Sequence, residues 1–232
     1  KTKVVIFAHD FVDSPHVYGN HFFTDFKSWF IFLDKVIKNT NYDWYIKVHP
    51  AANEITKKEI LKLKKDKKKI KILKKNFPNN HLVKLGIKFV LTVYGTIASE
   101  LPMSGIRVIN ASKNTPHYDY DFSLNPKNLN EYKNLLINLD KLKGNFKFNK
   151  KKLFMYQFMK ELTFQDHLFF KDTEKYFQFK DKRPMHLTPK IYEYWLKDFD
   201  LGVHNKIINN LSDFVYSKRY LSINQTIKNF QK

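Results

Sequence analysis

Polar side chains that can bind a phosphate group follow two of the apolar runs in this 232-residue sequence. His9 and Asp10 end the run KVVIFA, and Lys47, His49 and Pro50 close the run DWYIKV. An imidazole or an ammonium group donates hydrogen bonds to phosphate oxygens, and residues two apart share one side of an extended chain. These residues therefore predict an anion site. The alternative interpretation is a structural histidine beside a solvated lysine.

A third set of polar residues follows the apolar run FVLTV and begins with the turn at Gly95 and Thr96. N–H groups at a helix N-terminus attract anions, and glycine lets a phosphate approach the backbone closely. Thr96 and Ser99 add hydroxyl donors. We therefore predict that a phosphate contacts this turn, with Tyr94 and Glu100 in the same site. The alternative is an ordinary turn and helix N-cap.

The loop that follows the first apolar run is rich in groups suited to acid–base chemistry and to hydrogen bonding: His9, Asp10, Asp13, His16, Tyr18, Gly19, Asn20 and His21. Asp10 and Asp13 are candidates for a general base, and we take Asp10 and His16 as the catalytic candidates. We expect the substrate to be faced by His9, Tyr18, Gly19, Asn20 and, beyond a later run, His117. The spacing of the His and Asp residues matches no zinc template, so no metal site is predicted.

The pattern of apolar residues predicts the elements that carry these groups. β-Branched runs predict strands, and apolar residues at helical spacing predict helices between them. We expect strands at 3–8, 43–48, 70–73, 89–93 and 107–110, and helices at 22–37, 54–63, 80–85, 96–103 and 128–139. This alternation predicts a parallel sheet with helices on both faces, and such sheets bind ligands at the carboxyl ends of their strands.

Two domains are expected. Residues 1–143 are predicted to form a Rossmann-like α/β domain, and residues 144–232 a mainly helical C-terminal extension. Helical spacing in the extension is found at 153–170, 189–196 and 205–214.

The composition excludes several classes of protein. Apolar residues make up 43% of the chain and aromatic residues 16%, which is too apolar for a disordered chain. No apolar run approaches the roughly 18 residues of a transmembrane helix. Cysteine is absent, which excludes a thiolate metal site and fits a cytoplasmic protein. The phosphate-binding P-loop, the dinucleotide-binding GxGxxG motif and the hydrolase GxSxG motif are all missing.

The formal net charge of +20 favours anionic partners. Lysine greatly outnumbers arginine, whereas sequence-specific nucleic-acid readers use arginine, so no nucleic-acid partner is predicted. The lysine-rich stretch 62–75 is the candidate for peripheral contact with an anionic inner membrane. A solvated helix face is the alternative, and we favour it.

The motifs above, in their order, resemble those of bacterial capsule and lipopolysaccharide biosynthesis glycosyltransferases of the two-Rossmann-domain type (GT-B). The His-Pro pair at His49 and Pro50 is similar to the motif of sialyltransferases, Kdo transferases and polyol-phosphate transferases. The stretch 92–110 resembles the strand, glycine turn and acid-bearing helix with which GT-B enzymes hold the donor nucleotide. The resemblance covers residues 1–125.

This resemblance implies the donor-binding half of a metal-independent glycosyltransferase, with a nucleotide-activated sugar as substrate and no cofactor. It implies that His49, Thr96 and Ser99 contact the donor phosphate, and that Glu100 binds its ribose or sugar. The expected partners are a lipid-linked or oligosaccharide acceptor and an N-terminal Rossmann domain that this sequence does not contain.

Two other functions stay open as alternatives. A non-catalytic domain that binds a polysaccharide or a nucleotide sugar would keep the site but transfer nothing. A sugar-nucleotide epimerase of GT-B fold would need carboxylates in the cleft between two domains.

Overall fold

The computed structural model describes residues 1–66, 70–74, 76–142 and 147–162, together with single positions between 193 and 216. The chain divides into two compact units, Lys1–Tyr156 and Gln157–Lys232. The boundary expected after residue 143 lies outside the described residues, as do most residues of the two helices expected at 189–196 and 205–214. Among the described residues, no helix is long and apolar enough to cross a membrane.

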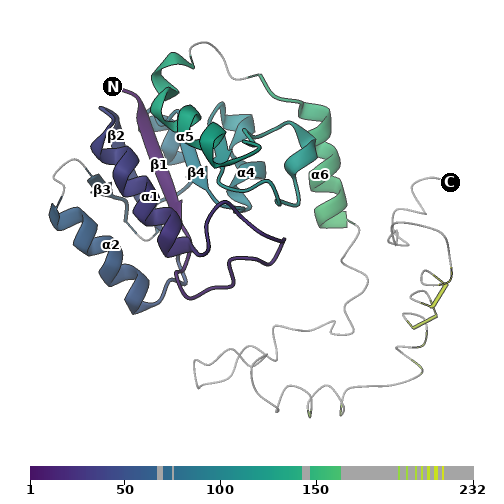
Figure 1. Cartoon of the computed structure of the whole chain (residues 1–232). Coiled ribbons are helices and arrows are strands. Elements are labelled where there is room, and N and C mark those ends of the chain that lie inside the picture. The colour runs from purple at the N-terminus through teal and green to yellow at the C-terminus, as the bar shows by residue number, and fades with distance from the viewer. Residues whose placement is uncertain are drawn as a thin grey trace. The chain divides into compact units, whose positions relative to one another are not determined.

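The first unit is built on a five-stranded sheet in the order β3-β2-β1-β4-β5, in which every neighbouring pair of strands is parallel (Figure 1). Its strands are β1 (Lys3–Ala8), β2 (Asp43–Val48), β3 (Ile70–Ile72), β4 (Phe89–Thr92) and β5 (Arg107–Asn110). Nearly every apolar residue of β1, β4 and β5 is buried, as expected for strands covered on both sides. The predicted parallel sheet is therefore confirmed.

Helices cover both faces of this sheet. They are α1 (Phe26–Lys38), α2 (Glu54–Asp66), α3 (His81–Lys84), α4 (Ile97–Glu100), α5 (Leu129–Ile137) and α6 (Lys150–Leu162), with 3-10 turns η1 (Pro102–Ser104), η2 (Tyr118–Tyr120) and η3 (Leu139–Lys141). Val4 and Ile6 of β1 belong to the core layer that holds α1 and α5, whereas Val5 belongs to the layer that holds α3 and α4. The alternation follows from the two-residue period of a strand, and it confirms the α/β fold class.

Helix α1 begins four residues later than the apolar spacing predicts. Asp25 has extended backbone angles, and its carboxylate accepts a hydrogen bond from the N–H of Ser28 at 2.5 Å. An N-cap of this kind satisfies one of the unpaired donors of the first turn and fixes the helix start. The aromatic residues before the cap still pack on the core, because the rings of Phe22 and Phe23 lie 6.1 and 6.2 Å from that of Tyr132.

The helix expected at 96–103 is in fact two short pieces, α4 and η1. Pro102 is the first residue of η1 and has no N–H, so the hydrogen-bond ladder of α4 cannot continue through it. Gly105 ends the second piece with a φ of 72°. Helix α4 is therefore a single turn, and its dipole contributes less to an anion site than the predicted longer helix would.

The strand order leaves a crevice at one defined place. The chain proceeds from β1 to β2 and β3 on one side and then returns to β4 and β5 on the other. In an open parallel sheet, the carboxyl ends of the two strands on either side of such a reversal form the usual ligand crevice. Here those two strands are β1 and β4.

Candidate functional site

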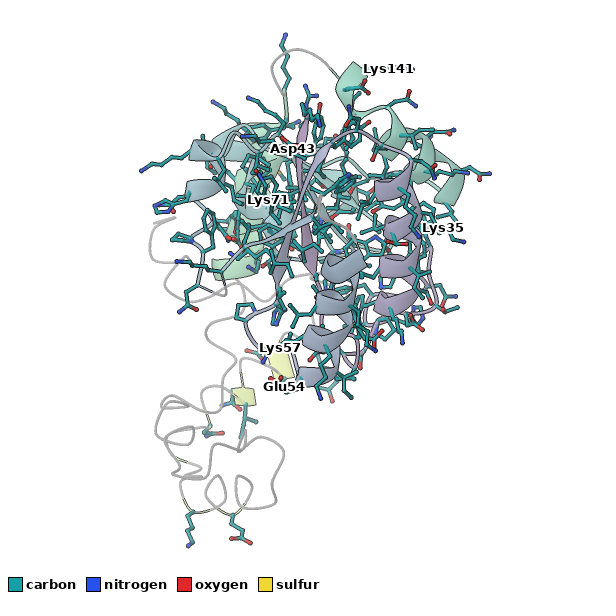
Figure 2. The ribbon with its side chains drawn as sticks, turned by 90° about the vertical axis from the view of Figure 1, so that its left-hand side faces the viewer. Lys35, Asp43, Glu54, Lys57, Lys71 and Lys141 are labelled. Atoms are coloured by element: carbon teal, nitrogen blue, oxygen red, sulfur yellow. The ribbon has the colours of Figure 1, made fainter. Side chains whose placement is uncertain are left out.

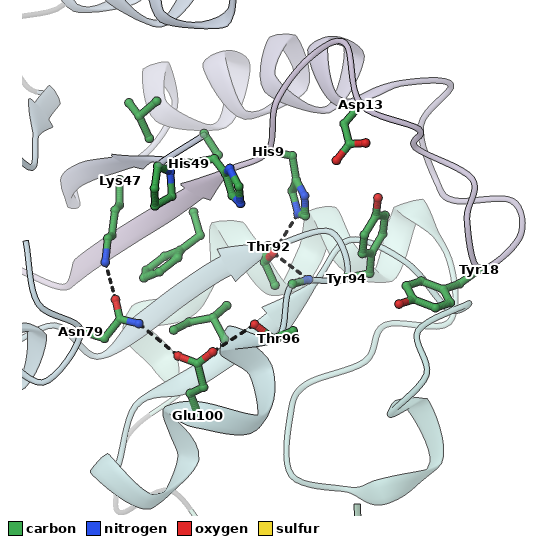
Figure 3. A pocket seen from close by; sticks show the side chains of 16 residues that line it. His9, Asp13, Tyr18, Lys47, His49, Asn79, Thr92, Tyr94, Thr96 and Glu100 are labelled. Atoms are coloured by element: carbon green, nitrogen blue, oxygen red, sulfur yellow. Dashed lines mark hydrogen bonds between the residues drawn. The ribbon is translucent and has the colours of Figure 1, made fainter. Parts of the chain in front are cut away.

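An open pocket of about 440 Å³ lies at the carboxyl ends of β1, β2 and β4 (Figure 3). Nine of the predicted site residues line it: His9, Tyr18, Lys47, His49, Pro50, Tyr94, Gly95, Thr96 and Glu100. Asp13, Asn79 and Thr92 line it as well. The volume falls within the range of about 300–1,000 Å³ typical of small-molecule sites.

His49 is exposed at the pocket wall, immediately after β2. Its Nδ1 accepts a hydrogen bond from the N–H of Ala51 at 3.2 Å, within a turn in which Ala52 donates to the carbonyl of His49 at 3.0 Å. An Nδ1 that accepts leaves the proton on Nε2. The His-Pro turn therefore holds the imidazole with an Nε2–H donor available to a ligand.

His9 ends β1 and reaches across to β4. Its Nε2 accepts a hydrogen bond from the N–H of Val93 at 3.2 Å and lies 3.0 Å from the hydroxyl of Thr92. Burial first, and then the nearby His49 and His21, lower the pKa of His9 from 6.5 to about 3. The ring is therefore a neutral imidazole that carries its proton on Nδ1.

A chain of hydrogen bonds forms the opposite wall of the pocket (Figure 3). The ammonium of Lys47 donates to the carbonyl of Phe77 at 2.8 Å and to the side-chain oxygen of Asn79. The amide of Asn79 donates to Glu100 at 3.1 Å, and the hydroxyl of Thr96 donates to the other oxygen of Glu100 at 3.0 Å.

The same chain of bonds sets what Lys47 can offer a ligand. Burial lowers the pKa of Lys47, and the carboxylate of Glu100 opposes this shift. Since an ammonium has three N–H groups, Lys47 keeps one donor beyond those used by Phe77 and Asn79. Glu100 brings a carboxylate into the pocket, and a carboxylate suits the hydroxyl groups of a sugar better than it suits a phosphate.

Gly95 has a structural role that differs from the predicted approach of a phosphate. Its N–H donates to the hydroxyl of Thr92 at 3.1 Å, and a Cβ placed on Gly95 would meet that hydroxyl at 2.7 Å. Only glycine lets the turn close on Thr92 at this distance. Ser99 is buried, its hydroxyl donates to the carbonyl of Thr96 at 2.9 Å, and it does not line the pocket.

An aromatic and acidic corner closes the pocket beyond β1 and β4. The ring of Tyr94 lies 5.0 Å from the ring of His9 and 5.3 Å edge-on from that of Tyr18. Its hydroxyl donates to the carbonyl of Ser14 at 2.9 Å, which holds the loop in place. Burial, followed by Asp13 and Tyr18, raises the pKa of Tyr94 to about 12, so this phenol remains a neutral donor.

Neither catalytic candidate lines the pocket. The carboxylate of Asp10 accepts from the hydroxyl of Thr56 at 2.5 Å and from the N–H of Asn53 at 3.2 Å, at the start of α2. The ring of His16 is exposed and bonds to the carbonyl of Thr24 at 2.9 Å. Asp13 is the loop carboxylate that does face the pocket.

Three further predicted residues also lie away from the pocket lining. Gly19 has a φ of 103°, and Asn114 packs against it and donates to the carbonyl of Asn20. His117 is buried beside β5, where its Nε2 lies 3.1 Å from the amide of Asn110. Burial lowers the pKa of His117 from 6.5 to about 4. These residues anchor loops rather than contact a ligand in the pocket.

The sequence alone did not indicate Asn79 or Thr92. Asn79 lies just before α3, six residues after the predicted strand 70–73, and only the fold brings it to Lys47. Thr92 is the last residue of β4, and its polar side chain at a strand end was the available signal. Among the described residues, no group of three or more His, Cys, Asp or Glu side chains is placed to hold a metal ion.

The sequence matches no protein-family model and none of the curated proteins with which it was compared.

Proposed function

We propose that this chain is the donor-binding half of a metal-independent GT-B glycosyltransferase that acts in bacterial surface polysaccharide synthesis. The observation that carries the proposal is that His49 and Thr96, 47 residues apart in the sequence, both line one pocket at the carboxyl ends of β1, β2 and β4. A nucleotide sugar needs donors for its phosphates and acceptors for its hydroxyls, and this pocket offers both.

The phosphates would contact the Nε2–H of His49 and the remaining N–H of Lys47. Glu100 and Asn79 on one side, and Asp13 on the other, would accept from the hydroxyls of ribose and sugar. Donors that already point at the departing phosphate stabilise its charge in the transition state without reorganisation. The acceptor would be a lipid-linked glycan or an oligosaccharide.

Nucleotide binding tests the proposal directly. Thermal unfolding of the chain is measured with CMP, UDP, GDP and ADP, and at least one of these raises the Tm. A nucleotide at about 100 times its Kd stabilises a protein that binds it only when folded by about 2.7 kcal/mol. If none of the four raises the Tm, the proposal is wrong.

A non-catalytic nucleotide-sugar-binding domain is the second candidate. It is favoured by the position of Asp10, because this predicted base is engaged at the start of α2 and not in the pocket. A transfer assay separates the two candidates and uses the sugar donor whose nucleotide stabilises the chain. A glycosyltransferase that contains this chain transfers sugar from that donor. A binding domain is stabilised by the same nucleotide but transfers no sugar.

A further inference from the structure

His9 is held in one orientation by the core around it. Its ring stacks on the ring of Phe26 at 4.4 Å with an angle of 8° between the planes, and the ring of Trp29 lies edge-on at 6.1 Å. Tyr94 covers it from a third direction at 5.0 Å. A ring enclosed in this way cannot flip freely, so each of its nitrogens keeps its place.

The two nitrogens of His9 have different surroundings. Nε2 is occupied, because Val93 N–H donates to it and the hydroxyl of Thr92 lies within hydrogen-bond distance. The N–H of Val93 can only donate, so Nε2 must be an acceptor, and the Thr92 hydroxyl, which accepts from Gly95 N–H, can also donate to it. The imidazole proton must therefore reside on Nδ1.

Nδ1 is the one polar atom of His9 that the fold leaves unused. No described residue makes a hydrogen bond to it, and it is not among the enclosed polar atoms that lack a partner. His9 itself lines the pocket beside His49 (Figure 3). Because the core does not fully enclose Nδ1, its N–H stays accessible, and the arrangement is suited to a ligand that supplies an acceptor.

We propose that the Nδ1–H of His9 donates a hydrogen bond to a phosphate oxygen of the bound nucleotide, as the partner of the Nε2–H of His49. This inference rests on the proposed function. The two imidazoles follow the ends of the adjacent strands β1 and β2, both line the pocket, and the N–H that each keeps free is on the opposite ring nitrogen. A phosphate has several acceptor oxygens and can take both donors at once.

The His9 ring stays neutral near pH 7, so its Nδ1–H remains the donor. His49 and His21 act on the ring electrostatically and Tyr94 packs against it, while Asp13, Tyr18, Lys47 and Glu100 line the same pocket. Burial and the two histidines hold the pKa of His9 at about 3 although two carboxylates line the pocket. His9 therefore binds as a neutral donor and adds no charge that the apo protein would have to bury.

Two substitutions separate the donor from the structural role of this ring. In His9→Gln, the side-chain oxygen takes the place of Nε2 and accepts from Val93, but no donor remains at the Nδ1 position. In His9→Asn, the amide nitrogen takes the place of Nδ1, but the acceptor for Val93 is lost. The Kd of the nucleotide that stabilises the wild-type full chain is measured by calorimetry for both variants.

We expect the Kd of His9→Gln to rise about tenfold to a hundredfold, since a hydrogen bond to a charged group is lost. We expect the Kd of His9→Asn to stay within about threefold of the wild-type value, although its Tm without ligand falls. A Kd of His9→Gln equal to that of the wild type overturns the inference and leaves the proposed function intact. Absence of nucleotide binding by the wild-type chain overturns both.

Discussion

The hydrogen-bond donor that each histidine offers to the pocket depends on which of its ring nitrogens is already bonded to the backbone. A backbone N–H occupies Nε2 of His9 and Nδ1 of His49, so the two rings carry opposite tautomers. His21 shows the contrast, because its Nδ1 lies 2.5 Å from the hydroxyl of Ser112, outside the pocket lining. In the proposed site, His9 and His49 would each donate to the ligand, whereas His21 anchors a loop.

His49→Ala tests the exposed donor. The ring has no packing role, so we expect the Tm without ligand to change by no more than about 2 °C. The Kd of the stabilising nucleotide rises about tenfold or more, because a charge-assisted hydrogen bond is lost. His49→Gln, which retains a donor near Nε2, recovers most of the affinity.

The matched control is His81→Ala, at another exposed histidine, which lies on α3 away from the pocket. Both variants are compared with the wild type by calorimetry and thermal unfolding. Equal affinities of His49→Ala and His81→Ala would remove His49 from the site.

Among the elements, the turn between β4 and α4 is the part of the site most sensitive to added volume. Gly95→Ala brings a Cβ to 2.7 Å from the hydroxyl of Thr92, which must move away from His9. We expect a loss of about 1–3 kcal/mol in the free energy of unfolding, as for other overpacked sites, together with weaker nucleotide binding. Urea unfolding measures the first effect.

A second background shows whether the contact with Thr92 causes this loss. In Thr92→Ala the hydroxyl is already absent, so the added Cβ meets nothing at 2.7 Å. Gly95→Ala should then cost less by about 1 kcal/mol or more, which is the coupling expected of residues in contact. The same cost in both backgrounds would place the strain elsewhere in the turn.

The sequence predicts elements well where burial alone decides them. Strands β1, β2 and β5 begin and end at the predicted residues, because a continuous apolar run bounded by polar residues has no other buried arrangement. Helix ends are less predictable, because a single side-chain hydrogen bond of Asp25 sets one of them and the missing N–H of Pro102 sets another. The alternation of strands and helices along the chain likewise predicts that the site lies at the carboxyl ends of the strands.

Which side chains of that edge face the pocket is not predictable from the sequence. Asp10 and Asp13 are equally plausible in the loop, but Thr56 on α2 engages the carboxylate of Asp10. Asn79 reaches Lys47 across 32 residues of chain. Both outcomes depend on long-range side-chain contacts, which the local pattern of residues does not contain.

For the whole molecule, the half-buried His9 and the buried His117 make the folded state sensitive to acid. The pKa of His9 is lowered to about 3 and that of His117 to about 4, whereas both titrate near 6.5 in the unfolded chain. Below pH 6.5 both imidazoles bind a proton in the unfolded chain, whereas in the folded chain they stay neutral down to their lowered pKa values. Their contribution to stability is therefore complete above pH 6.5 and is lost as the pH falls toward the folded pKa values.

Between pH 7.5 and pH 5 each histidine should cost about 2 kcal/mol of unfolding free energy, since one pKa unit corresponds to about 1.4 kcal/mol. Urea unfolding at the two pH values measures the loss. His117→Gln should remove about half of the pH dependence. A wild-type stability that is independent of pH over this range would contradict the neutral state of both rings.

The positive charge of the molecule is distributed over several elements. Lys35, Lys57, Lys71 and Lys141 belong to α1, α2, β3 and η3 and lie on different parts of the first unit (Figure 2). Lys57 is also paired with Glu54 at 2.6 Å. Charge arranged in this way favours weak, nonspecific attraction to any anionic surface over a single docking face.

Binding to lipid vesicles tests this distribution. Vesicles with about 30% anionic phosphatidylglycerol should bind the chain at about 20 mM salt and release it at about 300 mM, where the Debye length is far shorter. Lys71→Gln with Lys74→Gln, in the lysine-rich stretch, should weaken binding to the same degree as Lys35→Gln with Lys141→Gln. Loss of binding in the first pair alone would instead identify the lysine-rich stretch as a membrane-docking face. Because none of the lysines substituted here lines the pocket, a saturating nucleotide should leave vesicle binding unchanged.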